Sequence, residues 1–225
     1  MRATTLKAAI AIVGVLAVQR VHAQGAFLNL DFEQANLPPG VQPGGGVAIA
    51  RALPGWTGYV GGGPVSVVGY DDRNIDAAGI FVEDRLAPSQ QIQPIEGDYS
   101  VWLMGSAPPW PQPQTAAIAQ VGQIPADAKS IRFSTSFVPT DLPELTFAGQ
   151  PIPLVELGAS TSSITLGGDV TLLAGDTGEL RFTAGLGHAG LLDSIEFSPV
   201  AIPEPTAMVL SLLGLLLWKG RRCLR

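Results

Sequence analysis

The residue types that carry out nucleophilic and zinc chemistry are scarce in this 225-residue chain. The single cysteine, Cys223, lies two residues from the end of the sequence, and the only histidines are His22 and His188. A Cys–His nucleophile is therefore excluded for the central part of the chain, and a Cys/His zinc site is not expected there. His188 lies in the glycine-rich stretch 185–190, where we expect a solvated turn residue rather than a catalytic base.

Carboxylates are the remaining candidates for catalysis. Asp71-Asp72 and Glu83-Asp84 are pairs that could supply an acid and a base for glycoside hydrolysis, which needs two carboxyls roughly 5–10 Å apart. The alternative is that they are solvated loop charges on an acidic protein. Since the sequence singles out neither pair, we expect no catalytic residue, and a secreted polysaccharide hydrolase stays the second hypothesis.

Aromatic residues between positions 56 and 110 are candidates for sugar contact, because a flat exposed ring can stack on the C–H face of a sugar. Trp110 is the best candidate, since the proline-rich loop 105–114 presents it on a stiff segment. Trp56, Tyr59 and Trp102 are further candidates. For Trp56 and Trp102, which lie in strand-like contexts, packing in the core is the favoured alternative.

The elements that must position these residues are predicted to be β-strands. Glycine and proline recur throughout, no long stretch keeps a 3.6-residue apolar period, and runs such as 130–134 and 179–183 alternate as half-buried strands do. We predict a single all-β jelly-roll sandwich over residues 24–200. The predicted strands are 27–32, 47–50, 56–60, 65–70, 79–83, 99–104, 115–121, 130–137, 152–157, 163–166, 170–173, 179–184 and 191–197.

The N-terminus has the pattern of a secretory signal peptide. Arg2 and Lys7 precede an uncharged stretch from Ala8 to Gln19, and small residues occupy the −3 and −1 positions before a cut after Ala23. An N-terminal membrane anchor is the alternative, but the apolar run is short and no stop-transfer cluster follows it. We therefore expect residues 1–23 to be removed on export.

The C-terminus, residues 201–225, has three parts. The rigid Pro203-Glu204-Pro205 is followed by twelve uncharged residues, Ala207 to Trp218, and then by a basic tip. That run is shorter than the about 20 residues that usually span a bilayer, yet it is apolar all round, which favours a short membrane helix over a buried helix of a soluble fold. The basic tip favours the cytoplasmic side and contains Lys219, Arg221, Arg222 and Arg225.

The segment between these two ends is strongly acidic. Residues 24–204 carry six basic residues against all nineteen acidic ones, a net charge near −13. Such a surface repels nucleic acid, whose binding depends on lysine and arginine, and attracts cations. The segment holds no cysteine, so its stability must come from a core rather than from disulfides.

The two ends together resemble the PEP-CTERM sorting signal of exported proteins from Gram-negative and related bacteria. The resemblance rests on the order of a signal peptide, Pro203-Glu204-Pro205, a short apolar helix and an arginine-rich tip. It implies that an exosortase, a membrane enzyme, processes the chain near Pro-Glu-Pro. The protein would pass transiently through the inner membrane to the cell surface or the extracellular matrix.

The central segment resembles the galactose-binding-domain-like jelly roll found in carbohydrate-binding modules. Five pieces carry this resemblance, in order along the chain: Asn29–Glu33, Leu53–Trp56, Gly97–Val101, Ala119–Ala126 and Leu191–Phe197. In many proteins of this type a glutamate of the opening strand and an aspartate of the closing strand help to bind one structural Ca²⁺. The matching residues are Glu33 and Asp193, whose carboxylates would repel each other without a cation or a proton.

Three functional hypotheses follow. The first is a non-catalytic surface or matrix protein whose sandwich binds polysaccharide, which needs only the two targeting signals and the fold. The second is the polysaccharide hydrolase. The third is a structural matrix component without a ligand, which would assemble through exposed edge strands.

Overall fold

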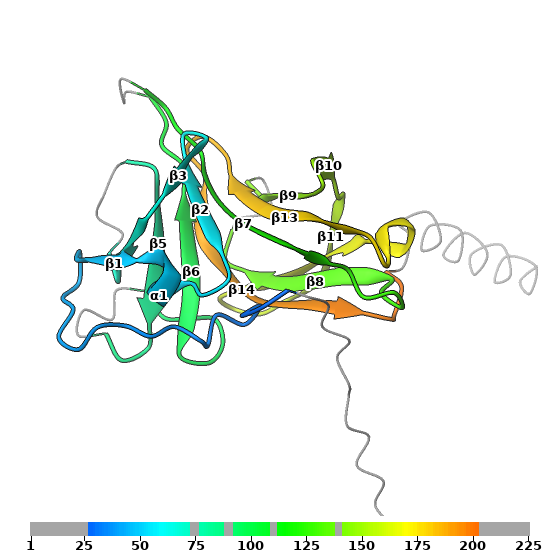
Figure 1. Ribbon diagram of the computed structural model, residues 1–225, viewed down its shortest axis with the longest axis horizontal. Helices are drawn as coiled ribbons and strands as arrows, with labels where there is room; N and C mark the ends of the chain where they lie inside the picture. Colours follow the sequence, from blue (N-terminus) through cyan, green and yellow to red (C-terminus); the bar gives the residue numbers. More distant parts are fainter. Residues whose placement is uncertain (1–26, 73–76, 88–91, 109–111, 138–140, 203–225) are drawn as a thin grey trace, which may run out of the picture.

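The computed structural model describes residues 27–72, 77–87, 92–108, 112–137 and 141–202. These residues form two β-sheets packed face to face, with one short α-helix and one 3₁₀ helix (Figure 1). The predicted all-β sandwich is therefore confirmed.

The larger sheet has eight strands and the smaller sheet has six. In spatial order the larger one contains β1 (Gly46–Ala48), β4 (Val67–Tyr70), β5 (Gly79–Asp84), β6 (Tyr99–Met104), β14 (Ala189–Ser198), β8 (Ser130–Thr135), β12 (Ile164–Asp169) and β11 (Leu154–Ala159). The smaller one contains β10 (Gln150–Pro151), β9 (Glu144–Phe147), β13 (Thr177–Ala184), β7 (Ala116–Gln123), β2 (Thr57–Val60) and β3 (Gly63–Val65). Among the pairs of strands that the structure describes, all are antiparallel except β4 and β5.

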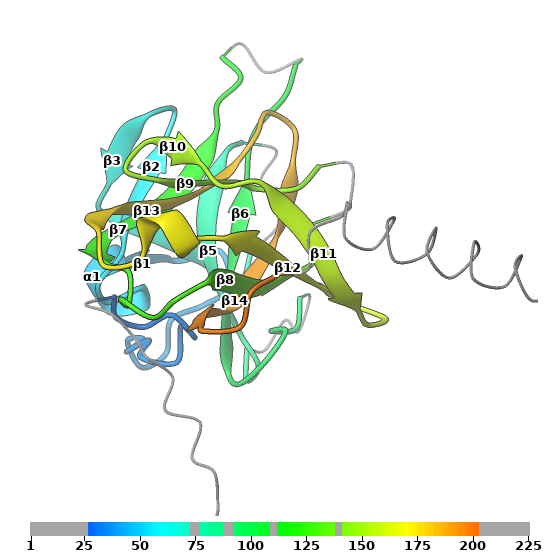
Figure 2. The ribbon, with the colours of Figure 1, turned by 90° about the vertical axis from the view of Figure 1, so that its right-hand side faces the viewer.

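The chain crosses from sheet to sheet as it advances. Strand β6 lies in the larger sheet, β7 in the smaller, β8 in the larger and β9 in the smaller. On the return, β13 inserts between β7 and β9 while β14 inserts between β6 and β8 (Figures 1 and 2). This wrapping makes the last strand the neighbour of segments about 60 to 90 residues earlier in the chain.

Alternating side chains explain how the sheets pack. In β8, Ile131 and Phe133 are buried, whereas Arg132 and Ser134 are only partly buried on the opposite face. In β13, Phe182 is fully buried, and its ring meets that of Phe133 edge to face at 5.1 Å across the sandwich. A run with period two thus buries one face of each strand, as its sequence predicted.

Two predicted strands are wrong. Residues 27–32 contain no strand, and the chain turns at 30–32, because Asn29 and Phe32 have positive φ values of 52° and 60° that an extended strand does not allow. In the predicted strand 170–173, Thr171–Leu173 form a 3₁₀ helix.

Three further differences concern shorter segments. Residues 49–50 belong to the four-residue helix α1 (Ile49–Ala52). Strand β9 was not predicted, although its residues alternate between exposed and buried. The short β10 was also not predicted.

The targeting segments lie outside the described residues. This applies to Ala23, to Pro203, Glu204 and Pro205, and to Lys219, Arg221 and Arg222. Within the described ranges, no helix has the length and apolar character needed to cross a bilayer.

Candidate functional site: an acidic pocket beside the last strand

Four carboxylates converge on one small pocket. Asp31, Glu33, Glu96 and Asp193 line a cavity of about 100 Å³ together with Gly97, and we call this set the acidic pocket. The residues come from three segments that are distant in sequence: the turn after Phe27, the loop between β5 and β6, and strand β14. The wrapping of β14 beside β6 is what brings these segments together.

Asp193 is the buried member of the acidic pocket, with 1% of its surface exposed. Its Oδ2 accepts hydrogen bonds from the Ser100 hydroxyl at 2.5 Å and from the Glu96 amide at 3.0 Å, and its Oδ1 accepts one from the Ser194 amide at 2.7 Å. Burial raises the pKa of Asp193 to about 6, and the hydrogen bonds from Ser100, Glu96 and Ser194 offset part of that rise. The charge of Glu96 adds a smaller upward contribution to the pKa. Near neutral pH the acidic pocket therefore holds the Asp193 carboxylate with almost no exposure to water.

Glu33 is held in place by backbone amides. Its carboxylate oxygens lie 2.9 and 3.0 Å from the Asp98 amide, and Oε1 also accepts from the Tyr99 amide at 3.0 Å. Gly97, with φ of +55°, presses against this carboxylate so closely that any Cβ would collide with it. The Glu33 side chain is thus held by the amides of a loop in which a Cβ at residue 97 would require the carboxylate to move.

Unusual backbone geometry is concentrated around the acidic pocket. Phe32, next to Glu33, has φ of 60°, and Ser194, next to Asp193, has φ of 49°. Ser194 lies in an irregularity of the β14–β8 pairing between Asp193 and Glu196, and its hydroxyl donates to Glu96 Oε2 at 2.5 Å. Positive φ is costly for a bulky residue, and such strain tends to cluster at ligand clamps and active sites.

The donor atoms of the acidic pocket suit a hard cation in kind. Ca²⁺ takes six to eight oxygen ligands from carboxylates, carbonyls and water, and the pocket offers carboxylate oxygens on three segments. The carboxylates of the acidic pocket do not by themselves surround a metal ion. Across the described ranges, no group of three or more His, Cys, Asp or Glu side chains is placed to hold a metal ion. Two of these carboxylates, together with water and backbone oxygens, could supply the ligands of a Ca²⁺ ion.

The predicted ligands Glu33 and Asp193 both line the acidic pocket. Asp31, Glu96 and Gly97 were not predicted to belong to it. One signal was available for Asp31, because it lies two residues from Glu33. Nothing in the sequence reveals the positive φ of Phe32 or Ser194, so the convergence of Glu96 on Asp193 could not be predicted.

The aromatic candidates are scattered over different surfaces. Trp56 is in the core at 4% exposure, and its indole nitrogen donates to the Asn29 carbonyl at 3.0 Å. Trp102 is partly exposed on the face of the larger sheet that points away from the core, paired with Phe81 and Leu191. Tyr59 lies on the outer face of the smaller sheet, under the Arg181 guanidinium at 4.0 Å from its ring centre. Trp110 lies outside the described residues.

Of the two carboxylate pairs weighed for catalysis, Glu83-Asp84 lies within a single strand. Glu83 and Asp84 follow each other in β5, so they point to opposite faces of the larger sheet. Asp84 accepts a hydrogen bond from the Tyr70 hydroxyl at 3.0 Å. Burial, and then this hydrogen bond, raise the pKa of Tyr70. His188 lies in the connection between β13 and β14, 3.6 Å from Asp141. This connection crosses from the smaller sheet to the larger sheet and does not join the two strands of a hairpin.

Comparison with known proteins gives no family assignment. No protein-family model matches the chain, and no curated protein matches it. Among solved structures, the chain is similar to an apo-form cyclase from Fischerella sp., with 13% identity, coverage of 80% of this chain and 98% of that chain, and a TM-score of 0.41. It is also similar to TmCBM61, solved in complex with β-1,4-galactotriose, with 13% identity, coverage of 78% and 98%, and a TM-score of 0.34. At these scores neither similarity bears on what this chain binds.

Proposed function

We propose that this chain is an exported, non-catalytic β-sandwich that binds extracellular polysaccharide and uses the acidic pocket to hold one Ca²⁺ ion. The observation that carries the proposal is the convergence of four carboxylates from three segments on a cavity flanked by strained residues. Such a site costs stability unless a ligand offsets the burial of the Asp193 carboxylate and the backbone strain.

The cation would act as a clamp between distant segments. Glu33 belongs to the opening turn, Glu96 to the loop before β6 and Asp193 to the closing strand. The ion would supply positive charge to carboxylates that the fold already orients through Asp98, Tyr99, Ser100 and Ser194. In a domain without cysteine, such a clamp replaces the stabilisation that disulfides often supply outside the cell.

Polysaccharide is the partner class that the surface supports best. The net charge near −13 of residues 24–204 disfavours nucleic acid and other polyanions. Tyr59 and Trp102 are partly exposed on the two outer faces, where rings can meet a neutral chain of sugars.

Export and processing rest on the terminal motifs. The motif Pro203-Glu204-Pro205 begins five residues after β14 ends at Ser198. An exosortase is the proposed processing enzyme, and the cell surface or matrix is the proposed destination. Intact mass of the protein recovered from its native cells tests this, with loss of about the first 23 residues and of the segment beyond Pro-Glu-Pro as the expected result. A full-length C-terminus held in the membrane fraction would contradict it.

Polysaccharide binding is tested by co-sedimentation of the protein with polysaccharide from the producing cells, in 10 mM Ca²⁺ and in EDTA. We expect the protein in the pellet with Ca²⁺ and a reduced fraction in EDTA. The Asp193→Asn variant should give the EDTA result in both buffers, because it removes the buried charge. Protein that stays in the supernatant in every buffer would overturn polysaccharide binding, and binding indifferent to Ca²⁺ would overturn the role of the cation.

A further inference from the structure

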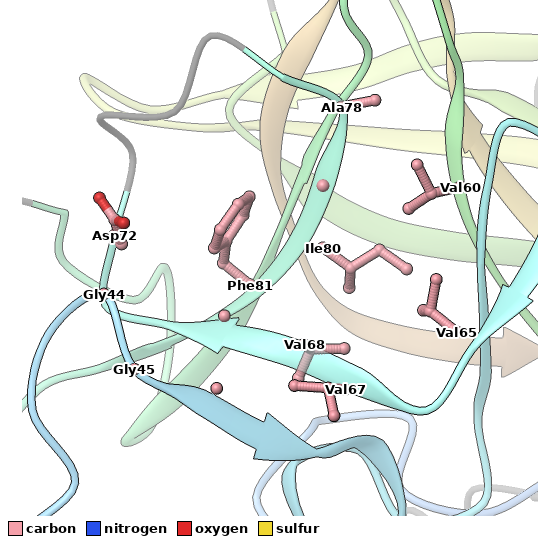
Figure 3. A pocket seen from close by; sticks show the side chains of 13 residues that line it. Gly44, Gly45, Val60, Val65, Val67, Val68, Asp72, Ala78, Ile80 and Phe81 are labelled. Carbon is pink, nitrogen blue, oxygen red and sulfur yellow. The ribbon is translucent and has the colours of Figure 1, made fainter.

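A second cavity lies where two strands of the larger sheet diverge. It has a volume of about 310 Å³ and is lined from β4 and β5, from the residues before β1, and from the ends of β2 and β3. Figure 3 shows the side chains of Val60, Val65 and Ile80 facing the same space. We call this cavity the strand wedge.

The strand wedge exists because β4 and β5 pair over only two positions. The parallel register joins Gly69 to Phe81 and Tyr70 to Val82, while Val67 and Gly79 at the starts of the two strands have no such partner in the described pairing. At Gly69 a side chain would collide with the Phe81 ring, so the ring occupies the place of a missing Cβ. The strands are thus held together at one end and open at the other.

The walls of the strand wedge are aliphatic. Val60, Val65, Val67 and Ile80 supply branched methyl groups, and Val67 stands at the rim with 54% of its surface exposed. Phe81 also lines the wedge, but its ring is packed over Gly69, so we expect no free ring face for stacking. A ligand would therefore be held through methyl contacts rather than through aromatic stacking.

The polar groups of the strand wedge come almost entirely from the backbone. Five of the thirteen lining residues are glycines. The amides of Gly44 and Gly45 already donate to the Tyr70 and Gln42 carbonyls, so main-chain carbonyl oxygens, with a second lone pair, are the groups that can accept from a ligand. Asp72 is the only ionisable residue among the thirteen described residues that line the wedge. Its negative charge disfavours an anionic ligand, whereas neutral hydroxyls can donate hydrogen bonds to main-chain carbonyls.

We propose that the strand wedge binds a neutral sugar residue that carries a methyl group, such as a 6-deoxyhexose or a methyl ether, within an extracellular polysaccharide. The methyl group lies against the partly buried Val60 and Val65, in front of the buried Ile80, and the ring hydroxyls face main-chain carbonyls at the mouth. The volume lies in the range of small-ligand cavities, at its lower end. This inference rests on the proposed polysaccharide binding and names the class of sugar.

The sharpest test compares two sugars that differ at one position. L-Fucose carries a methyl group where L-galactose carries a hydroxymethyl group, and an aliphatic cavity leaves that extra hydroxyl without a partner. Titration of the isotope-labelled full-length protein, followed by valine and isoleucine methyl NMR, should show at least about tenfold tighter binding of L-fucose. The shifts should be centred on Val60, Val65 and Ile80. A parallel pair, 6-O-methyl-D-galactose and D-galactose, distinguishes a methyl ether from a deoxy sugar.

A blocking variant provides the second measurement. Val67→Trp at the exposed rim should close the strand wedge without disturbing the core, and Val121→Trp, at a position 68% exposed on the smaller sheet, is the matched control. We expect the first variant to lose at least about tenfold in affinity for the methyl sugar and the second to keep it. Equal affinities for the paired sugars, or methyl sugar binding that Val67→Trp leaves unchanged, would overturn the inference.

The two proposals fail in different ways. If the protein sediments with polysaccharide and Val67→Trp has no effect on methyl sugar binding, polysaccharide binding stands and the strand wedge is not its site. If neither the wild-type protein nor Val67→Trp sediments with polysaccharide, the proposed function fails. The NMR titration alone then decides whether the strand wedge binds a methyl sugar.

Discussion

The acidic pocket and the strand wedge are two cavities of one sandwich, made in opposite ways. The acidic pocket is made by bringing together charged side chains from segments up to 162 positions apart, Asp31 and Asp193, and it needs residues in strained backbone conformations. The strand wedge is made by leaving side chains out, with glycines where two neighbouring strands part. The acidic pocket should therefore be sensitive to pH, to cations and to the addition or replacement of a single atom. The strand wedge should be sensitive only to the shape and polarity of its ligand.

The largest expected effect is that of Gly97→Ala. The new methyl group would displace the Glu33 carboxylate from the Asp98 and Tyr99 amides in a residue with positive φ, so we expect a loss of about 3–5 kcal/mol in the free energy of unfolding. Gly149→Ala is the control, because Gly149 also has positive φ but has nothing within 4 Å of the added atom, and it should cost about 1–2 kcal/mol. Urea denaturation measures both. Equal losses would mean that contact with Glu33 is not what holds the acidic pocket.

The next effect is a dependence of stability on pH. Asp193 has a pKa of about 6 in the fold against 3.8 when unperturbed, so the folded state binds the proton more tightly than the unfolded state. Without divalent cations, this contribution is fully present below pH 4 and is lost as pH rises through 6, on the order of 3 kcal/mol. Asp193→Asn should remove most of that slope in denaturation series between pH 4 and 7. A wild-type slope equal to that of Asp193→Asn would show that burial does not raise the pKa of Asp193.

Calcium should act in the opposite direction at neutral pH. With the affinity typical of extracellular sites, 10 mM Ca²⁺ should raise the free energy of unfolding by about 1.5–3 kcal/mol at pH 7. The gain should shrink at pH 4.5, where Asp193 is protonated, and should be small in Asp193→Asn. Thermal or urea unfolding with Ca²⁺, Mg²⁺ and EDTA measures it. Identical stability in Ca²⁺ and EDTA would contradict a cation in the acidic pocket.

The smallest expected effect lies in the strand wedge. Val67→Ser removes apolar surface at a rim position that is already 54% exposed, so stability should change by less than about 0.5 kcal/mol. The variant should keep the wild-type responses to pH and Ca²⁺, since the rim of the wedge does not line the acidic pocket. Urea denaturation at pH 7 with and without Ca²⁺ tests this. A changed calcium response would show that the two cavities are coupled.

Sequence reasoning succeeded where one strand carries its own pattern. The alternation around Ile131 and Phe133 predicted β8, and the same period in residues 179–184 predicted most of β13. It failed at 27–32, where Phe27, Leu30 and Phe32 are buried as in a strand but positive φ at Asn29 and Phe32 turns the chain. Apolar content reports burial, whereas the direction of the chain at those residues depends on contacts such as the Asn29 carbonyl with the Trp56 indole.

The candidate sites divide in the same way. Glu33 and Asp193 were predicted through a resemblance in short motifs, and the structure places both in the acidic pocket. Glu96 had no such signal, because it reaches the pocket only through the loop before β6 and its hydrogen bonds with Asp193 and Ser194. The strand wedge had no signal either, since it depends on where the pairing of β4 and β5 stops.

The sequence alone determined the all-β class, the acidity of the central segment, the absence of disulfides there, and the motifs at both ends. These properties depend on composition and on local period, which need no knowledge of distant contacts. Tertiary structure alone decided which carboxylates meet, which aromatic rings stay at the surface, and where the sheet opens into a cavity. Each of these depends on strand order and register, which join residues far apart in the chain through hydrogen bonds that no local pattern specifies.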